Sequence, residues 1–263
     1  MNSVFIKTFR DKRWFIVGWF IGFMALAALM VAFYPAMHQD GTIDQLVATM
    51  PSAFKGLIGN LADLTRFDTY LASQLFDIRI SLLAGIMATI LALSITVNEE
   101  EKGQLRTILA LPISRTKLLL QKWFAMLVII FIVLLGTTVS IFALQSTVDA
   151  SIEFSVMVNL FIMTWLVIAT LASVTFAVAM ASGKRSLAML FGILLLAGSF
   201  IISTFGAAVD WLADYEKLSI FHYFPASDVA RNGIDTNNVI VLGGVALISL
   251  LVAIIAFRRR DVN

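Results

Sequence analysis

The longest run of acidic side chains in the sequence is three glutamates, Glu99 to Glu101. Carboxylates can bind metals or transfer protons when suitable partners lie at the right spacing. The two histidines, His38 and His222, stand far from this run, and there is no H-E-x-x-H sequence. An E-E-x-x-x-R protease pattern also fails, because its arginine position holds Gln104 or Leu105. Cysteine is absent, which excludes thiol catalysis and thiolate metal sites. Together these patterns lead us to expect neither catalytic residues nor a metal site.

The sequence also lacks a phosphate-binding motif for ATP. A chain that holds ATP phosphates in a Walker loop carries the pattern G-x-x-x-x-G-K-[ST]. Here the Gly183-Lys184 pair is followed by Arg185 and has no earlier glycine at the required distance. We therefore expect energy to come from another subunit or from an ion gradient.

The composition is that of a membrane protein. Of 263 residues, 60% are hydrophobic and 14% are charged, whereas soluble domains average about 45–50% and about 25%. A membrane-spanning helix needs about 20 mainly apolar residues. Six stretches meet this condition, at 14–34, 80–97, 118–144, 156–181, 187–209 and 239–257. We predict an all-α polytopic membrane protein with one transmembrane domain over 1–263.

The charges differ between the two sides of the predicted membrane domain. Six spans place both termini on one side, together with the loop after the second span and the turn at Lys184. That side holds 14 of the 19 Lys and Arg residues and 5 of the 17 acidic residues. Basic residues at membrane ends mark the cytoplasmic side and contact anionic lipids. We therefore predict cytoplasmic termini, a multi-pass plasma membrane protein, lipid contacts and no nucleic acid.

A carrier driven by an ion gradient generally needs ionisable residues near the middle of the membrane. No Asp, Glu, Lys, Arg or His falls deep within the six predicted spans, and Asp77 and Arg79 lie at the outer end of the second. This distribution disfavours a secondary transporter. It agrees better with a pathway that is driven from outside the membrane plane.

Two predicted extracellular segments, 35–79 and 210–238, connect the spans on the other side. Apolar residues between positions 43 and 64 follow helical spacing, which predicts one or two amphipathic helices broken near Pro51. The second segment is rich in aromatic residues, such as Trp211 and Tyr223. These aromatics are typical of an interfacial belt, and closing the outer mouth of a pathway is the alternative.

The loop at 98–117 has the most specific pattern in the chain. Its three glutamates are placed as at the start of a helix, where the positive end of the helix dipole lies. Pro112 is expected to stop this helix, and Ser114 to cap a new one that leads into the third span. Such a short amphipathic element can dock into a groove of a partner or lie on the inner leaflet.

This loop resembles the signature of ABC-2 type permeases, the membrane subunits of ABC exporters. The matching positions are Glu99, Glu100, Glu101, Gly103, Leu105, Arg106, Pro112, Ser114 and Arg115. Lys122 after the loop, the aromatic stretch Phe221–Pro225 and the ending Phe257–Asp261 are similar to the same family. The resemblance covers essentially the whole chain.

The resemblance implies a mechanism and partners. In this family the loop forms a coupling helix that sits on a separate cytoplasmic nucleotide-binding ATPase and transmits its motion. ATP and Mg would then be bound by that partner and not by this chain. The permeases act as dimers and export by alternating access, so a second copy or a paralogue is expected. Residues 1–13 resemble the family's interface helix along the inner leaflet.

Small residues recur at helical spacing in several spans, as in helices that pack closely. Gly18 and Gly22 form such a pair in the first span, and packing inside one subunit or at a subunit interface are the two interpretations. By resemblance, spans two and five face the translocation path. The candidate path-lining residues are then Ser81, Gly85, Ala88, Ala92, Gly192, Leu195, Ser199 and Ser203.

We predict a permease subunit of an ABC-2 type exporter. A gradient-driven secondary transporter and a membrane immunity or structural protein remain the alternatives. Drugs, peptides, lipids and ions are all substrates of relatives with this architecture, and the spans do not choose among them.

Overall fold

Helices make up the described part of the chain. The structure is a computed structural model that describes residues 3–38, 66–101, 103, 114–206 and 209–260, and within these ranges it has helices and no strands. Six helical units in these ranges are long and apolar enough to span a membrane. Five are single helices: α1 (Ser3–His38), α8 (Arg115–Leu144), α9 (Phe154–Ser182), α10 (Arg185–Phe205) and α13 (Thr236–Arg259). The sixth joins α4 (Phe67–Tyr70), η2 (Leu71–Ile80), α5 (Ser81–Ser94) and α6 (Val97–Glu101).

The first helix is longer than predicted. The sequence predicted an interface helix at 1–13 followed by a span at 14–34, but Ser3–His38 is one helix of 36 residues. No glycine or proline interrupts residues 3–17, so nothing in the sequence breaks the helix there. At 1.5 Å per residue α1 is about 54 Å long, which exceeds the roughly 30 Å hydrocarbon core.

The second helical unit begins before the predicted span 80–97. Residues 67–79, assigned from the sequence to an extracellular segment, are helical and continue directly into α5. Asp68, Asp77 and Arg79 interrupt the apolar run, so the sequence placed the start of the span at residue 80. Its apolar residues nevertheless face the core, and Leu71 and Leu75 are fully buried. The ten residues of η2 form a π-helix, in which the Arg79 guanidinium donates to the Gln74 carbonyl five residues earlier.

Short helices fill the segment that was predicted as extracellular at 210–238. They are α11 (Asp210–Ala213), η5 (Glu216–Leu218), η6 (Phe221–Tyr223) and α12 (Ala226–Asn232). A further short helix, η3 (Gln145–Val148), extends α8. The amphipathic helices predicted between residues 43 and 64 lie outside the described residues.

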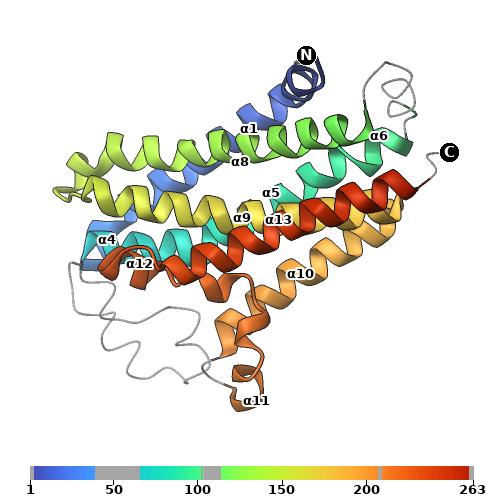
Figure 1. Ribbon diagram of the computed structural model, residues 1–263. Helices are drawn as coiled ribbons and strands as arrows, with labels where there is room; N and C mark the ends of the chain where they lie inside the picture. Colours follow the sequence, from blue (N-terminus) through green and yellow to red (C-terminus); the bar gives the residue numbers. More distant parts are fainter. Residues whose placement is uncertain (1–2, 39–65, 102, 104–113, 207–208, 261–263) are drawn as a thin grey trace.

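Helix α9 lies in the middle of the bundle (Figure 1) and contacts α5, α8, α10 and α13. In an apolar stretch of 18 residues taken from each unit, 72% of the positions are buried in α9 and in the second unit, but only 22% in α1, α10 and α13. The outer helices therefore expose apolar faces, as expected for helices that contact lipid or another subunit.

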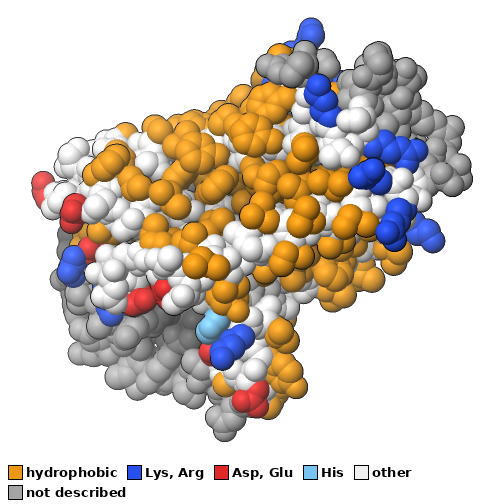
Figure 2. Space-filling view, viewed as in Figure 1, with side chains coloured by type: hydrophobic (Ala, Val, Ile, Leu, Met, Phe, Trp, Pro, Cys, Tyr) orange, Lys and Arg blue, Asp and Glu red, His pale blue; other side chains and the backbone are white. Residues whose placement is uncertain are grey.

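Both termini lie at one end of the bundle, with α6 and the start of α8 (Figure 1). We call this the loop end and the opposite one the far end. Figure 2 shows hydrophobic side chains over the middle of the helices and a concentration of Lys and Arg at the loop end. Most acidic side chains visible in this view lie toward the far end. The basic and acidic side chains that the sequence assigned to opposite sides thus lie at opposite ends of the bundle.

Helices α1 and α8 pack tightly against one another at Gly136. A Cβ atom at this position would lie 2.5 Å from the backbone oxygen of Phe20. Because a backbone atom cannot rotate away, a larger residue would have to separate the two helices.

We expect Gly136→Val to destabilise the protein by about 1–3 kcal/mol, the usual cost of overpacking. Gly198→Val is the matched control, because a Cβ at Gly198 meets no atom within 4 Å. Apparent melting of the purified variants by gel filtration after heating tests this expectation. Equal losses in the two variants would mean that helix propensity and not the α1–α8 contact is responsible.

Candidate functional site

The first glutamate of the run forms a buried ion pair at the loop end. Glu99 Oε2 lies 2.5 Å from Lys122 Nζ, and the exposed fractions of the two side chains are 8% and 1%. The ammonium also donates to the carbonyl oxygen of Ile95 at 2.6 Å. Since an unpaired charge at this depth would be costly, this pair fixes the end of α6 against α8.

The second glutamate pairs with the end of the last helix. Glu100 Oε1 accepts from Arg260 Nη2, and Arg260 Nη1 donates to the carbonyl oxygen of Met180 at 2.9 Å. The guanidinium lies against Gly183, where any Cβ would collide with it. Gly183 also has φ +61°, a conformation that favours glycine and ends α9. Arg260 therefore joins α6, α9 and α13 at one point.

The third glutamate makes a weaker contact with the start of α10. Glu101 Oε2 lies 3.8 Å from Arg185 Nη1, and both side chains are about half exposed. Pairs of this kind contribute about 0–1 kcal/mol.

On the other side of the loop, Ser114 and Arg115 hold the start of α8. Ser114 has an extended backbone and accepts from the Lys117 N–H at 3.3 Å, so the predicted N-cap is confirmed. Arg115 Nη1 donates to the carbonyl oxygens of Arg260 at 2.7 Å and Phe257 at 3.2 Å. Its guanidinium lies 5.7 Å from the Phe257 ring centroid, within reach of a cation–π contact.

These contacts define an anchor cluster at the loop end. Its members are Glu99, Glu100, Glu101, Arg115, Lys122, Arg185 and Arg260. They come from α6, the base of α8, the first turn of α10 and the end of α13. The two ends of the 98–117 loop are therefore attached to several helices of the bundle.

The structure describes part of the predicted loop site. Gly103 has φ +70° and donates its N–H to the Glu100 carbonyl, which turns the chain away after α6. Leu105, Arg106 and Pro112 lie outside the described residues. Helix α6 begins at Val97, and Glu99 and Glu100 lie in its first turn, so the predicted position of acidic residues near a helix start is confirmed for these two. They also form ion pairs with basic residues of other helices, which the sequence did not predict.

Arg185 and Arg260 were absent from the predicted site. The signal that could have found them is that three acidic residues and several basic residues lie near predicted helix ends that meet at the same end of the bundle. Which basic residue meets which glutamate depends on helix packing, so the sequence could not assign the pairs.

The candidate path-lining residues of the second span are buried inside this subunit. Ala88 and Ala92 are fully buried, and Ser81 donates to the carbonyl oxygen of Phe76 at 2.7 Å. A Cβ at Gly85 would collide with Leu196 of α10. These small residues allow close packing of α5 within the bundle.

The candidates on α10 divide between packing and polar contacts. A Cβ at Gly192 would lie 2.8 Å from Thr89 Cγ2, and Leu195 is half-buried. Ser203 Oγ lies 2.7 Å from Ser219 Oγ, which itself donates to the carbonyl oxygen of Ser199. The two serines of α10 thus hold the chain just before η6 against the far end of this helix. In this chain taken alone, their hydroxyls are engaged by that segment.

Comparison with known proteins assigns the family. The chain matches the family described as ABC-2 family transporter protein over residues 3–262. The chain belongs to the ABC-2 transporter family. No curated protein matches it. The match spans the whole bundle, including every residue of the anchor cluster.

Membership agrees with the six apolar helices and identifies a membrane transport component. ABC-2 transporter membrane proteins of this kind are multi-pass proteins of the plasma membrane. Within the described ranges, no group of three or more His, Cys, Asp or Glu side chains is placed to hold a metal ion. In this ABC-2 protein the acidic groups of the anchor cluster are paired with basic side chains.

We expect Ser114→Ala in this ABC-2 protein to cost about 1 kcal/mol, because the first turn of α8 loses its cap. For a chain of this size that corresponds to a fall in apparent melting temperature of roughly 2–4 °C. Thr116→Ala, two residues further along α8, is the control. If both variants melt at the wild-type temperature, the Ser114 cap does not stabilise the protein.

Proposed function

We propose that this chain is the permease subunit of an ABC-2 type exporter, coupled through residues 98–117 to a separate ATPase. The observation that carries the proposal is the attachment of both ends of this loop. Glu99 and Glu100 hold its first end to α8 and α13, and Arg115 holds its second end to the end of α13. A displacement of the loop would therefore displace the helices.

The ion pairs of the anchor cluster differ in strength. The Glu99–Lys122 pair is almost fully buried, whereas the Glu101–Arg185 pair is half exposed and screened by solvent. Force applied to the loop would reach α8 and α13 through firm contacts and α10 through a weak one.

The charge distribution supports a cytoplasmic position for the loop end. Lys and Arg gather there (Figure 2), and positive residues near membrane ends favour the cytoplasmic side. Both termini and the loop would then face a cytoplasmic ATPase. ATP and Mg would be bound by that partner, whose nucleotide-driven closure would move the loop.

Exposed apolar faces support a dimer of permeases. A Cβ atom at Gly18 or at Gly22 would meet no atom within 4 Å, so this face of α1 is open to a close neighbour. Trp14 and Ile21 on α1 and Leu194 on α10 are more than half exposed. A second copy or a paralogue covering these faces would enclose a translocation path, which would open alternately to the two sides.

Co-purification from the native host tests the coupling. A tagged chain extracted in mild detergent is expected to bring down a nucleotide-binding ATPase, and Arg106→Glu is expected to reduce its recovery. Lys217→Glu, on the segment between α10 and α13, is the matched charge reversal. The proposal fails if no ATPase is recovered and Arg106→Glu leaves transport intact. Transport that follows ion gradients and continues without ATP would instead identify a secondary transporter.

A further inference from the structure

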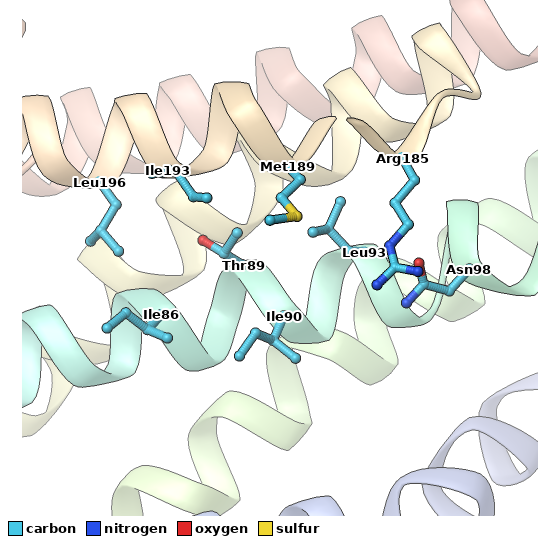
Figure 3. Close-up of a pocket in the computed structure, with 9 residues that line it drawn as sticks. All are labelled: Ile86, Thr89, Ile90, Leu93, Asn98, Arg185, Met189, Ile193 and Leu196. Carbon is cyan, nitrogen blue, oxygen red and sulfur yellow. The ribbon is translucent and has the colours of Figure 1, made fainter. Parts of the chain in front are cut away.

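An apolar slot runs along the outside of the bundle between α5 and α10 (Figure 3). It is lined by Ile86, Ile90 and Leu93 of α5 and by Met189, Ile193 and Leu196 of α10, and its volume is about 220 Å³. Ile90 and Ile193 are each 46% exposed, so the slot opens to the surface of the subunit. Drug-sized ligands usually occupy about 300–1,000 Å³. The slot is better matched to a single aliphatic chain.

The loop end of the slot opens onto a polar shelf. Arg185 and Met189 line both hollows, and Glu101, Lys184 and Ser186 complete the shelf. Two basic groups and one carboxylate give the shelf a formal charge of +1. The N-terminus of the 21-residue helix α10 also lies here, without a side-chain cap, and its free N–H groups favour an anion.

Asn98 adds a polar group at the boundary between slot and shelf. Its Oδ1 atom is buried and has no hydrogen-bond partner among the described residues. The ends of the Asn98 and Arg185 side chains point toward one another in Figure 3. A ligand that carries a hydroxyl beside its anionic group would satisfy this acceptor, which otherwise costs about 1–3 kcal/mol.

We propose that the slot and shelf form a binding site for an anionic phospholipid. One acyl chain lies between α5 and α10, and the phosphodiester contacts Arg185 and Lys184. A monoanionic headgroup neutralises the shelf, and a headgroup hydroxyl can donate to Asn98. Inorganic phosphate would leave the apolar slot empty, and a neutral chain would leave the shelf without its counter-ion. This site goes beyond the proposed function, because binding requires neither an ATPase nor transport.

Lipid retention by the purified full-length chain tests the site. Native mass spectrometry after titration with phosphatidylglycerol, phosphatidylethanolamine or phosphatidylcholine of equal chain length gives the occupancy of each. We expect phosphatidylglycerol to bind most tightly and Arg185→Gln to weaken it about tenfold, the effect of one lost charge-assisted hydrogen bond. Lys184→Gln is expected to act in the same direction. Arg258→Gln, an exposed charge at the same end but away from the slot, is expected to leave binding unchanged.

The apolar slot, which would hold the acyl chain of the lipid, is tested separately. Ile90→Trp fills the slot and is expected to abolish binding, whereas Leu120→Trp changes an exposed residue of α8 outside it. Each variant is accepted only if it elutes and melts like the wild type. Equal binding of the three lipids, an Ile90→Trp variant that binds normally, or competition by inorganic phosphate alone would overturn the proposal. Loss of ATPase co-purification with lipid binding preserved would refute the proposed function and leave this site standing.

Discussion

Replacing Lys122 with Met is expected to destabilise the protein by about 3–5 kcal/mol, the largest stability effect that the structure predicts for a single residue. The variant leaves Glu99 buried without its ion pair. Ile95 loses a hydrogen bond to its carbonyl oxygen at the same time. The free energy gained by burying an apolar Met side chain is too small to offset a buried, unpaired carboxylate. The folded yield and the apparent melting temperature in detergent measure the loss.

Two further variants distinguish the ion pair from a general effect of charge. Lys117→Met removes an exposed charge five residues away and is expected to melt within about 0.5 kcal/mol of the wild type. Adding Glu99→Gln to Lys122→Met removes both charges and is expected to recover much of the stability. Wild-type melting of the single Lys122→Met variant would show that the pair is not buried in the folded protein.

Reversing the charge of Arg260 is expected to have the largest effect on transport. Arg260→Glu places a carboxylate beside Glu100 and removes the hydrogen bond to Met180, so the first end of the loop is released from α9 and α13, while Arg115 still holds the second end. We expect cargo moved per ATP hydrolysed to fall about tenfold, within the usual range for the coupling of two sites. Hydrolysis by the partner ATPase is expected to continue. The measurement compares both rates in vesicles that contain the purified complex.

The charge swap provides the decisive control. Glu100→Arg combined with Arg260→Glu restores opposite charges across the same contact, and we expect it to recover a substantial part of the coupling. Arg259→Glu, an exposed neighbour, is expected to behave like the wild type. If hydrolysis and transport fall together in Arg260→Glu and the swap recovers neither, Arg260 serves folding and not coupling.

Local features of this chain were predictable from its sequence. Six spans follow from apolar length, because the hydrocarbon sets a minimum helix length that few other segments reach. The Ser114 cap follows from a residue type and its distance to the next apolar run. The position of the helix over residues 67–79, ahead of the predicted span 80–97, is also local in origin. Asp68, Asp77 and Arg79 lower the mean hydropathy, although the rest of the helix packs against the core.

Contacts between distant helices could not be predicted in this way. Glu100 and Arg260 are 160 residues apart, and several other bases at the loop end had the same charge and similar position. Ser199 and Ser203, which the family resemblance names as candidates for lining a path, are a second example. Their contacts with Ser219 depend on how the segment after α10 folds back onto this helix, and that folding cannot be predicted from residue spacing.

Site-specific photo-crosslinking from the loop tests the central claim most directly. A photoreactive amino acid at Gln104, in the tagged chain expressed in its native host, is expected to crosslink to a nucleotide-binding ATPase identified by mass spectrometry. The same amino acid at Asn237, exposed at the start of α13 near the far end, is expected to give no such product. Crosslinks from Gln104 to lipid alone, or an ATPase captured equally from Asn237, would contradict coupling through this loop.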